Sequence, residues 1–157
     1  MNIRAIAAID KKRGLANEHG IPWKLPGDIA YVREKTQGGA VIMGYGTYTE
    51  LTKPLVGRRS FVFYDGMEPL REGFEAVTDL VEFMKNPPDN LWLFGGAGLF
   101  AQTIQYANEL YLTQLKEDFE CTKFFPEYRD DFELSWESDL QRENEVRYTF
   151  QIWKRKD

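Results

Sequence analysis

The sequence of 157 residues is short of the side chains on which several kinds of function depend. Cys121 is its only cysteine, which excludes an internal disulfide and a cysteine-based zinc site. His19 is its only histidine, so a Ser-His-Asp triad or a two-histidine metal site would depend on this one residue. We expect His19 to be a polar loop residue, Cys121 to be inert, and no metal to be bound.

Positive charge and long apolar segments are scarce as well. The chain has 20 lysines and arginines against 25 aspartates and glutamates, a net charge of −5. Nucleic acids and anionic membranes select basic patches, so we expect neither as a partner. The apolar run Ile3–Ile9 contains Arg4 and is too short for a signal-peptide core or a membrane span. These features predict a cytoplasmic protein.

What is present is typical of a folded domain. Hydrophobic residues make up 43% of the chain and charged residues 29%, close to the globular average. A chain of this length buries a sizeable core without disulfides or metals. We therefore predict one domain over residues 1–157.

Short apolar runs typical of buried strands alternate with segments of helical periodicity. Strands are predicted at Ile3–Ile9, Ala40–Met43, Ser60–Tyr64, Leu91–Phe94 and Leu110–Leu115. Helices are predicted at Ile29–Thr36, Thr47–Leu51, Asp79–Lys85 and Leu99–Ala107. Alternation at Leu134–Trp136 and Val146–Ile152, around the polar connection 138–145, predicts a terminal antiparallel hairpin. The fold class is therefore α/β, with a largely parallel sheet and an antiparallel edge.

A glycine-rich turn, Gly95–Gly98, joins a predicted strand to a predicted helix. Such a turn lets a ligand approach the backbone closely, and the following helix offers free N–H groups to an anion. The spacing Gly96-x-Gly98-x-x-Ala101 satisfies a loose dinucleotide fingerprint, but the 59 residues after Gly98 are too few for a Rossmann domain. By itself the motif is equally consistent with a ligand site and with a simple tight turn.

Asp28 and the pair Arg58–Arg59 can each be interpreted as structural residues or as ligand-binding residues. Asp28 at a helix start is most simply a cap, yet it follows Trp23 and a proline-fixed turn among apolar residues. A carboxyl in an apolar pocket is a proton source or binds a hydrogen-bond donor, and we expect burial to raise its pKa more than the helix start lowers it. The two arginines are most simply solvated; alternatively, one of them binds a carboxylate ligand through its forked donors.

A set of motifs in this order resembles the dihydrofolate reductase family over nearly the whole chain. The motifs are Ile6-Ala7-Ala8-Ile9, Gly14-Leu15-Ala16, Pro22-Trp23-x-Leu25-Pro26-x-Asp28, Val41-Ile42-Met43-Gly44-x-x-Thr47, Pro54-Leu55-x-Gly57-Arg58, Gly95-Gly96, Leu110-Tyr111-Leu112-Thr113 and Phe125-Pro126. The resemblance implies a three-layer fold with a mostly parallel, eight-stranded central sheet and about four helices. It also implies hydride transfer from a reduced nicotinamide to C6 of dihydrofolate, with protonation at N5, in one-carbon metabolism.

The resemblance implies roles for individual residues. Asp28, hydrogen-bonded by Thr113, and Trp23 would be catalytic. The substrate-binding residues would be Ile6, Ala8, Asp28, Val32, Leu51, Leu55, Arg58, Phe94 and Thr113, with Arg58 on the glutamate α-carboxylate. The cofactor-binding residues would be Ala8, Leu15, Ile21, Gly44, Tyr45, Gly46, Thr47, Tyr64, Asp65, Gly95, Gly96, Ala97, Gly98, Leu99 and Phe100. The segment 10–23 would be a mobile loop closing over the nicotinamide.

The sequence departs from the family pattern around the adenosine 2′-phosphate. Tyr45, Tyr64, Asp65 and Gly98 stand where many members place cations or hydroxyls. Asp65 would repel a phosphate but accept a hydrogen bond from a 2′-hydroxyl, as acids do in NAD sites. NADPH is the expected cofactor by family default, with Arg59, Lys53 or Arg71 reaching the phosphate, and we expect its preference over NADH to be weakened or reversed. A second departure, Val32 in place of a bulkier aromatic, predicts a roomier pocket and altered antifolate binding.

Two other functions fit parts of the pattern. A related pterin or pyrimidine reductase on the same fold would share the glycine turn without needing Arg58 or the pair Asp28–Thr113. A non-enzymatic nucleotide-binding module would use the turn alone, with Asp28 as a cap. In the preferred interpretation the partners are dihydrofolate and antifolates, and the protein is a monomer.

Overall fold

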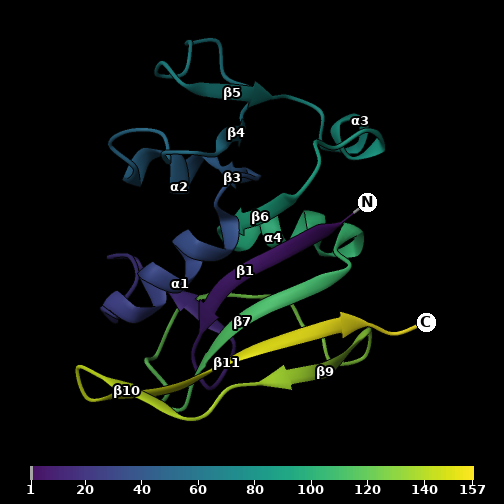
Figure 1. Cartoon of the computed structure of the whole chain (residues 1–157). Helices are drawn as coiled ribbons and strands as arrows, with labels where there is room; N and C mark the ends of the chain where they lie inside the picture. Colours follow the sequence, from purple (N-terminus) through teal and green to yellow (C-terminus); the bar gives the residue numbers. More distant parts are fainter. Residues whose placement is uncertain (1) are drawn as a thin grey trace.

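Six parallel strands form the centre of the fold in the computed structural model, which describes residues 2–157. Strand β1 (Ile3–Ile9) lies between β6 (Leu91–Gly95) and β7 (Glu109–Leu115) and is parallel to both. The sheet continues from β6 through β3 (Ala40–Gly44), β4 (Arg59–Phe63) and β5 (Phe74–Val77), again in parallel (Figure 1). Its β1, β3 and β6 strands consist largely of buried apolar residues, as expected for parallel strands covered on both faces.

The other edge of the sheet is antiparallel. Strand β11 (Val146–Arg155) pairs with β7, and its outer side is covered in succession by β10 (Gln141–Glu143) and β9 (Phe132–Glu137). The sheet thus has nine strands in eight positions, which confirms the predicted fold class. Asn144 (φ 48°) and Glu145 (φ 66°) close the β10–β11 hairpin with two left-handed residues, the combination of a type I′ turn.

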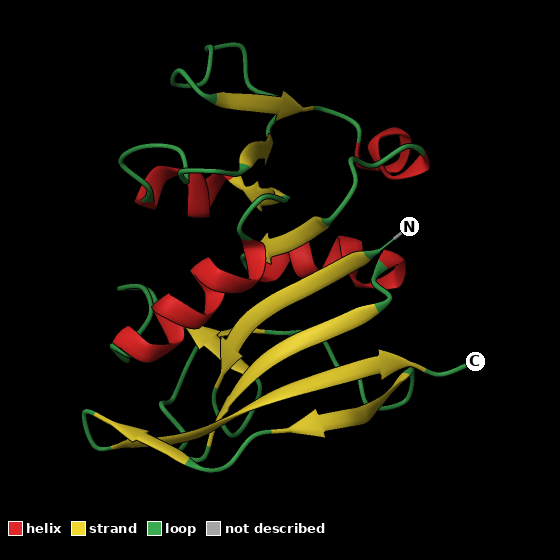
Figure 2. Ribbon diagram, in the orientation of Figure 1, coloured by secondary structure: helices red, strands yellow, loops and turns green. Residues whose placement is uncertain are grey.

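Helices cover both faces of the sheet (Figure 2). Helices α3 (Leu80–Lys85) and α4 (Ala97–Thr103) pack on one face, where Leu80, Met84, Leu99 and Phe100 join the main core. Helices α1 (Pro26–Thr36) and α2 (Tyr45–Glu50) pack on the other face, around a second cluster that contains Trp92. The four helices agree with the prediction. In residues 2–157, none is long and apolar enough to span a bilayer.

Several predicted helix boundaries differ from those in the structure. Helix α2 begins two residues before Thr47, at Tyr45, directly at the end of β3. Ala97 and Gly98 belong to helix α4, so the glycine turn ends at Gly96. The α-helix ends at Thr103, whose hydroxyl donates to the carbonyl of Leu99, and a 3₁₀ turn (Ile104–Tyr106) follows.

Four short strands have no counterpart in the prediction. Strand β5 is a four-residue edge strand with two exposed residues, and β10 lies within the polar connection 138–145. Strands β2 (Gly14–Ala16) and β8 (Lys123–Phe124) form a separate two-stranded sheet. The apolar runs that identify a strand are missing here because these strands are short and partly exposed.

Candidate active site

A cleft of about 930 Å³ opens where the carboxyl ends of β1, β3 and β6 meet. Ligand sites in open α/β sheets form at this position, because the loops after parallel strands diverge there. The cleft is lined from β1 by Ile6 and Ala8, from β3 by Gly44 and from β6 by Phe94. Helices α1, α2 and α4 and the segment after β1 supply the rest of its wall.

Asp28 lies in the first turn of α1 and faces this cleft. Its Oδ1 accepts a 2.6 Å hydrogen bond from the hydroxyl of Thr113, which is buried in β7. Burial raises the pKa of Asp28 from its ordinary value of 3.8, the Thr113 bond lowers it, and the charge of Glu143 raises it further; the net direction is upward. The expected direction of the pKa shift is therefore confirmed.

Asp28 does not cap its helix. The capping position of α1 is Leu25, which supplies no side-chain acceptor, and Pro26 occupies the first helical position. Among residues 2–157, the side chain of Asp28 is hydrogen-bonded by Thr113 and not by a backbone N–H of the first turn. The side chain of Asp28 is therefore directed to Thr113 and does not serve as a helix cap.

Trp23 lines the cleft, and its indole packs edge-on against Phe119 at 5.2 Å between ring centroids. Phe119 in turn donates its N–H to Oδ2 of Asp10 at 2.9 Å. Trp23 lies in a loop, and a residue of the segment after β7 packs against its indole.

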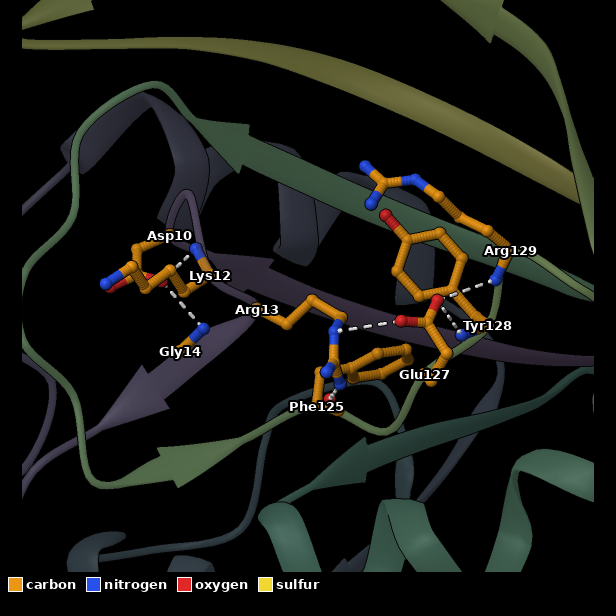
Figure 3. Close-up of polar contacts among 8 residues, drawn as sticks. All are labelled: Asp10, Lys12, Arg13, Gly14, Phe125, Glu127, Tyr128 and Arg129. Atoms are coloured by element: carbon orange, nitrogen blue, oxygen red, sulfur yellow. Dashed lines mark hydrogen bonds and ion pairs between the residues drawn. The ribbon is translucent and has the colours of Figure 1, made fainter.

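Asp10 anchors the first part of the segment that was predicted to be a mobile loop (Figure 3). It is buried, and its Oδ1 accepts hydrogen bonds from the N–H groups of Lys12 (2.9 Å) and Gly14 (2.7 Å). Close by, Arg13 forms an ion pair with Glu127 at 3.6 Å. Beyond these anchors, Glu18, His19, Gly20 and Ile21 line the cleft. Closure of this segment over a ligand remains a prediction.

An apolar slot leads from Asp28 to an arginine. Its walls are residues expected to bind substrate: Ile6, Val32, Leu51, Leu55 and Phe94. At its outer end Arg58 lines the cleft, oriented by hydrogen bonds from Nη2 to the carbonyl of Val56 (2.7 Å) and from Nη1 to the hydroxyl of Thr36 (3.1 Å). Burial and the neighbouring Arg33 lower the pKa of Arg58.

Arg59, the second arginine of the pair, points away from this cleft. Its Nε and Nη2 bind both carboxylate oxygens of Glu75 on β5, at 3.1 and 2.9 Å. It is exposed and does not line the cleft. The pair is thus divided: Arg59 is a surface residue, and Arg58 faces the cleft.

The opposite end of the cleft is lined by backbone. Gly44 ends β3, and Gly96, Ala97 and Gly98 form the start of α4. A Cβ added at Gly98 would meet no atom within 4 Å, and the same is true of Gly46 in α2. The first N–H groups of α4 have no partner within the helix, so they are available to an anionic ligand. Leu15, Ile21, Tyr45, Thr47, Leu99 and Phe100 complete this end of the cleft.

Four residues expected at the site do not line the cleft. Thr113 lies behind Asp28 and reaches the site through it. Tyr64 stacks on Tyr45, which does line the cleft, at 4.8 Å between ring centroids. Asp65 is exposed beside it, and Gly95 is buried before the cis peptide bond to Gly96.

Some lining residues escaped the prediction. They are Ala7, Ala16, Glu18, His19, Gly20, Ile29, Arg33, Glu50 and Lys123. Ile29 and Arg33 each follow by one residue a predicted site residue of α1, Asp28 and Val32, and helical periodicity from Asp28 does not indicate them. Lys123 belongs to β8, and no local pattern connects it with the cleft.

The fold and this cleft define a class of protein, an α/β protein with a ligand-sized cleft at the carboxyl ends of its parallel strands. Comparisons with known proteins identify the family. The model of the family "Dihydrofolate reductase" matches residues 2–155. The dihydrofolate reductase of Bacillus subtilis strain 168 is 29% identical over 163 residues, which cover 99% of this chain and 95% of the relative. That of Staphylococcus aureus strain Mu50 is 30% identical over 153 residues, 96% of each chain.

A solved structure shares the fold. It is the dihydrofolate reductase from Enterococcus faecalis, complexed with NADP(H) and RAB-propyl, with a TM-score of 0.87 and 24% identity. The similarity covers 99% of this chain and 97% of that one. The chain belongs to the dihydrofolate reductase family.

Proposed function

We propose that this cleft reduces 7,8-dihydrofolate to 5,6,7,8-tetrahydrofolate. The observation that carries the proposal is the pair Asp28–Thr113, a mostly buried carboxyl held at 2.6 Å at the inner end of an apolar slot. Arg58 at the outer end of the same slot distinguishes this function from reduction of a bare pterin or a pyrimidine, which offers no carboxylate to bind. Membership of the family argues against a non-enzymatic nucleotide-binding module.

Asp28 has two tasks in this proposal. As an acceptor, its carboxylate binds the 2-amino group and N3 of the pterin, two donors that match two oxygens. As an acid, its raised pKa keeps a larger protonated fraction near neutral pH, which supports protonation at N5. Thr113 holds the carboxyl in one orientation, so that both tasks meet the same edge of the ring.

The remainder of the substrate follows the slot. Val32, Leu51 and Leu55 contact its apolar middle, and Arg58 binds the glutamate α-carboxylate with a forked, charge-assisted contact. The hydrogen bonds to Val56 and Thr36 fix the guanidinium before substrate arrives, which lowers the entropic cost of binding. The absence of a bulky aromatic at Val32 supports altered binding of antifolates.

The glycine-lined end of the cleft fits a nicotinamide cofactor. Its open backbone at Gly44, Gly46 and Gly96–Gly98 admits a long, flat, anionic molecule, and the start of α4 offers N–H groups to its phosphates. When bound, the reduced nicotinamide supplies the hydride for C6. Ala8 and Trp23 position the reacting rings from the cleft wall, and Leu15 and Ile21 exclude water from them.

We propose further that the cofactor site accepts NADH as well as NADPH. The three cations expected near the 2′ position do not line the cleft: Lys53, Arg59 and Arg71. Arg59 is bound to Glu75, and Arg71 is held on Tyr48 by hydrogen bonds to its hydroxyl and carbonyl. Parallel assays with the two cofactors test this point. A preference for NADPH above about 100-fold, a discrimination of about 2.7 kcal/mol, would contradict it.

The decisive experiment is an absorbance assay at 340 nm with dihydrofolate, for the wild type and for Asp28→Asn. The amide keeps the size of the side chain and an oxygen for Thr113, but it supplies no proton, and its NH2 group cannot accept from the second of the two pterin donors, the 2-amino group and N3. We expect cofactor binding to be unchanged and turnover to fall severely, most of all at neutral pH. An Asp28→Asn variant with wild-type turnover would refute the role of Asp28.

A monomeric, cytoplasmic protein remains our expectation. Support for a monomer comes from the cleft, whose apolar slot, arginine and glycine-lined end are all supplied by one chain. Light scattering of the purified protein measures the oligomeric state directly.

A further inference from the structure

Helix α1 carries Asp28, yet its own sequence leaves its start uncapped. Leu25 at the capping position has no side-chain acceptor, and Pro26 has no N–H. The next N–H, that of Gly27, is donated to the carboxylate of Glu143, at 2.9 Å to Oε1 and 3.2 Å to Oε2. Glu143 ends strand β10, 116 residues further along the chain. The acceptor missing from the helix start is therefore supplied by the C-terminal hairpin.

The hairpin holds this carboxylate rigidly. Tyr148, a buried residue of β11, donates its hydroxyl to Oε1 of Glu143 at 2.9 Å. Asn144, in the turn, donates to the carbonyl of Lys24 at 2.7 Å. The hairpin thus contacts the chain on both sides of Leu25 and Pro26.

Gly27 is matched to this arrangement. A Cβ at position 27 would lie 2.8 Å from Oε1 of Glu143, closer than Cβ contacts allow, and 3.1 Å from the hydroxyl of Tyr148, a tight contact. Any larger residue at position 27 would displace the carboxylate. The glycine and the glutamate therefore form one structural unit directly before Asp28.

We propose that Glu143 is a positioning residue for Asp28: it fixes the first turn of α1 through Gly27 and places a second carboxyl group beside the catalytic one. The proposal rests on the proposed function, in which Asp28 is that carboxyl. Glu143 does not line the cleft. It acts through the orientation and the protonation of Asp28.

The electrostatic part depends on what else surrounds Asp28. Strand β7 contributes the hydroxyl of Thr113, β11 contributes Tyr148, and α1 itself contributes Tyr31. Tyr31 and Tyr148 have pKa values raised by burial, so both are neutral near pH 7. Within residues 2–157, two side chains affect the pKa of Asp28: the hydroxyl of Thr113 lowers it, and the charge of Glu143 raises it. A higher pKa enlarges the protonated fraction of Asp28 at neutral pH.

The test uses Glu143→Gln, which removes the charge but keeps an oxygen that accepts from Gly27 and Tyr148. The matched control is Glu145→Gln, which removes the same charge from an exposed residue of the same turn. Two measurements are made on each protein: the titration of Asp28 by ¹³C NMR of labelled aspartate, assigned with Asp28→Asn, and the pH dependence of single-turnover hydride transfer.

In Glu143→Gln we expect the pKa of Asp28 to fall by about 0.5–1 unit and the pH–rate profile to move down by the same amount. At pH values above both pKa values, hydride transfer then slows by about three- to tenfold. Glu145→Gln titrates and reacts as the wild type. A second variant, Gly27→Ala, displaces the carboxylate without removing it and lowers the pKa of Asp28 by a smaller amount.

An unchanged titration of Asp28 in both Glu143→Gln and Gly27→Ala would overturn the proposal. So would a loss of thermal stability in Glu143→Gln with no movement of the pKa, because the residue would then be purely structural. The NMR titration needs no catalysis. If the wild type failed to reduce dihydrofolate while Glu143→Gln still shifted Asp28, the proposed function would fail and the coupling of the two carboxyls would stand.

Discussion

The hydroxyl of Thr113 donates a 2.6 Å hydrogen bond to Asp28 and thereby joins β7 to α1 across 85 residues of sequence. Because a hydrogen bond to the ionised form favours that form, Thr113 opposes the effect of burial on the pKa of Asp28. The carboxyl is therefore balanced between a buried environment that favours the acid and a donor that favours the carboxylate. This balance suits a group that both binds donors and supports protonation.

Replacing Thr113 by valine removes the donor at nearly constant volume. We expect the pKa of Asp28 to rise further, so that the falling limb of the pH–rate profile for hydride transfer moves to higher pH. We also expect a higher KM for dihydrofolate, because the carboxyl is no longer held in one orientation. The control is Thr149→Val, which removes a 2.8 Å bond from a buried threonine to Glu137 on β9, away from the cleft. A Thr113→Val profile that coincides with the wild type would contradict the assigned role.

The raised pKa of Asp28 has a consequence for stability. Below pH 3.8, the value of an unperturbed aspartate, both folded and unfolded states carry the proton and the group costs nothing. Between that value and the higher folded pKa the unfolded state ionises first, so stability falls as pH rises, and the loss is complete above the folded pKa. Asp28→Asn removes this loss. We expect its thermal midpoint to exceed that of the wild type by a few degrees at pH 7.5, with the gain vanishing near pH 4.

Thermal scans of both proteins across this pH range check the sign. A destabilised Asp28→Asn at pH 7.5 would mean that the ionised carboxyl is better satisfied in the folded protein than burial indicates. If Asp28→Asn loses turnover and gains thermal stability, Asp28 is a residue that is kept for activity at the expense of stability.

Arg58→Leu tests the outer end of the slot. Loss of a charge-assisted contact worth about 1.5–3 kcal/mol predicts a rise in KM for dihydrofolate of about 10- to 100-fold. A pterin without the glutamate tail should be affected little. Arg59→Leu removes an identical charge from the next residue, where it binds Glu75 outside the cleft, and should leave both substrates unaffected. If KM rose equally for dihydrofolate and for the pterin without the tail, Arg58 would act on the structure of the slot and not on the carboxylate.

The sequence predicted the parts of the fold that local pattern determines. Continuous apolar runs identified β1, β3 and β6. Asp79, the first residue of a predicted helix, caps α3, where its side chain accepts from the N–H of Glu82. The strand that carries Glu143 was not predictable in this way. Strand β10 is polar because it lies at the solvent-exposed edge of the sheet, and it was placed within a loop.

The same limit applies to individual site residues. The resemblance to a family named Asp28 and Thr113 together, and the structure shows their side chains in contact. Glu143 had no motif, because its function depends on a contact between a hairpin and a helix start that only the three-dimensional fold creates. From the sequence, Arg59 could be a solvated residue or a ligand-binding one. Its partner, Glu75, shows that it is a surface residue, but Glu75 lies on β5, a strand that the sequence did not predict.

A substitution at the glycine-lined end of the cleft should increase the preference for NADPH over NADH. Tyr45 faces the cleft, is 46% exposed and stacks on Tyr64, so an arginine placed there would meet open space and a flat aromatic support. We expect Tyr45→Arg to raise the ratio of kcat/KM for NADPH over NADH by about tenfold or more, because a guanidinium binds a 2′-phosphate through two parallel hydrogen bonds. Tyr45→Phe keeps the stacking on Tyr64 and should leave the ratio unchanged. If Tyr45→Arg altered both cofactors equally, the 2′ position would lie elsewhere in the cleft, and the glycine-lined face at Gly98 would be the next site to test with the same substitution.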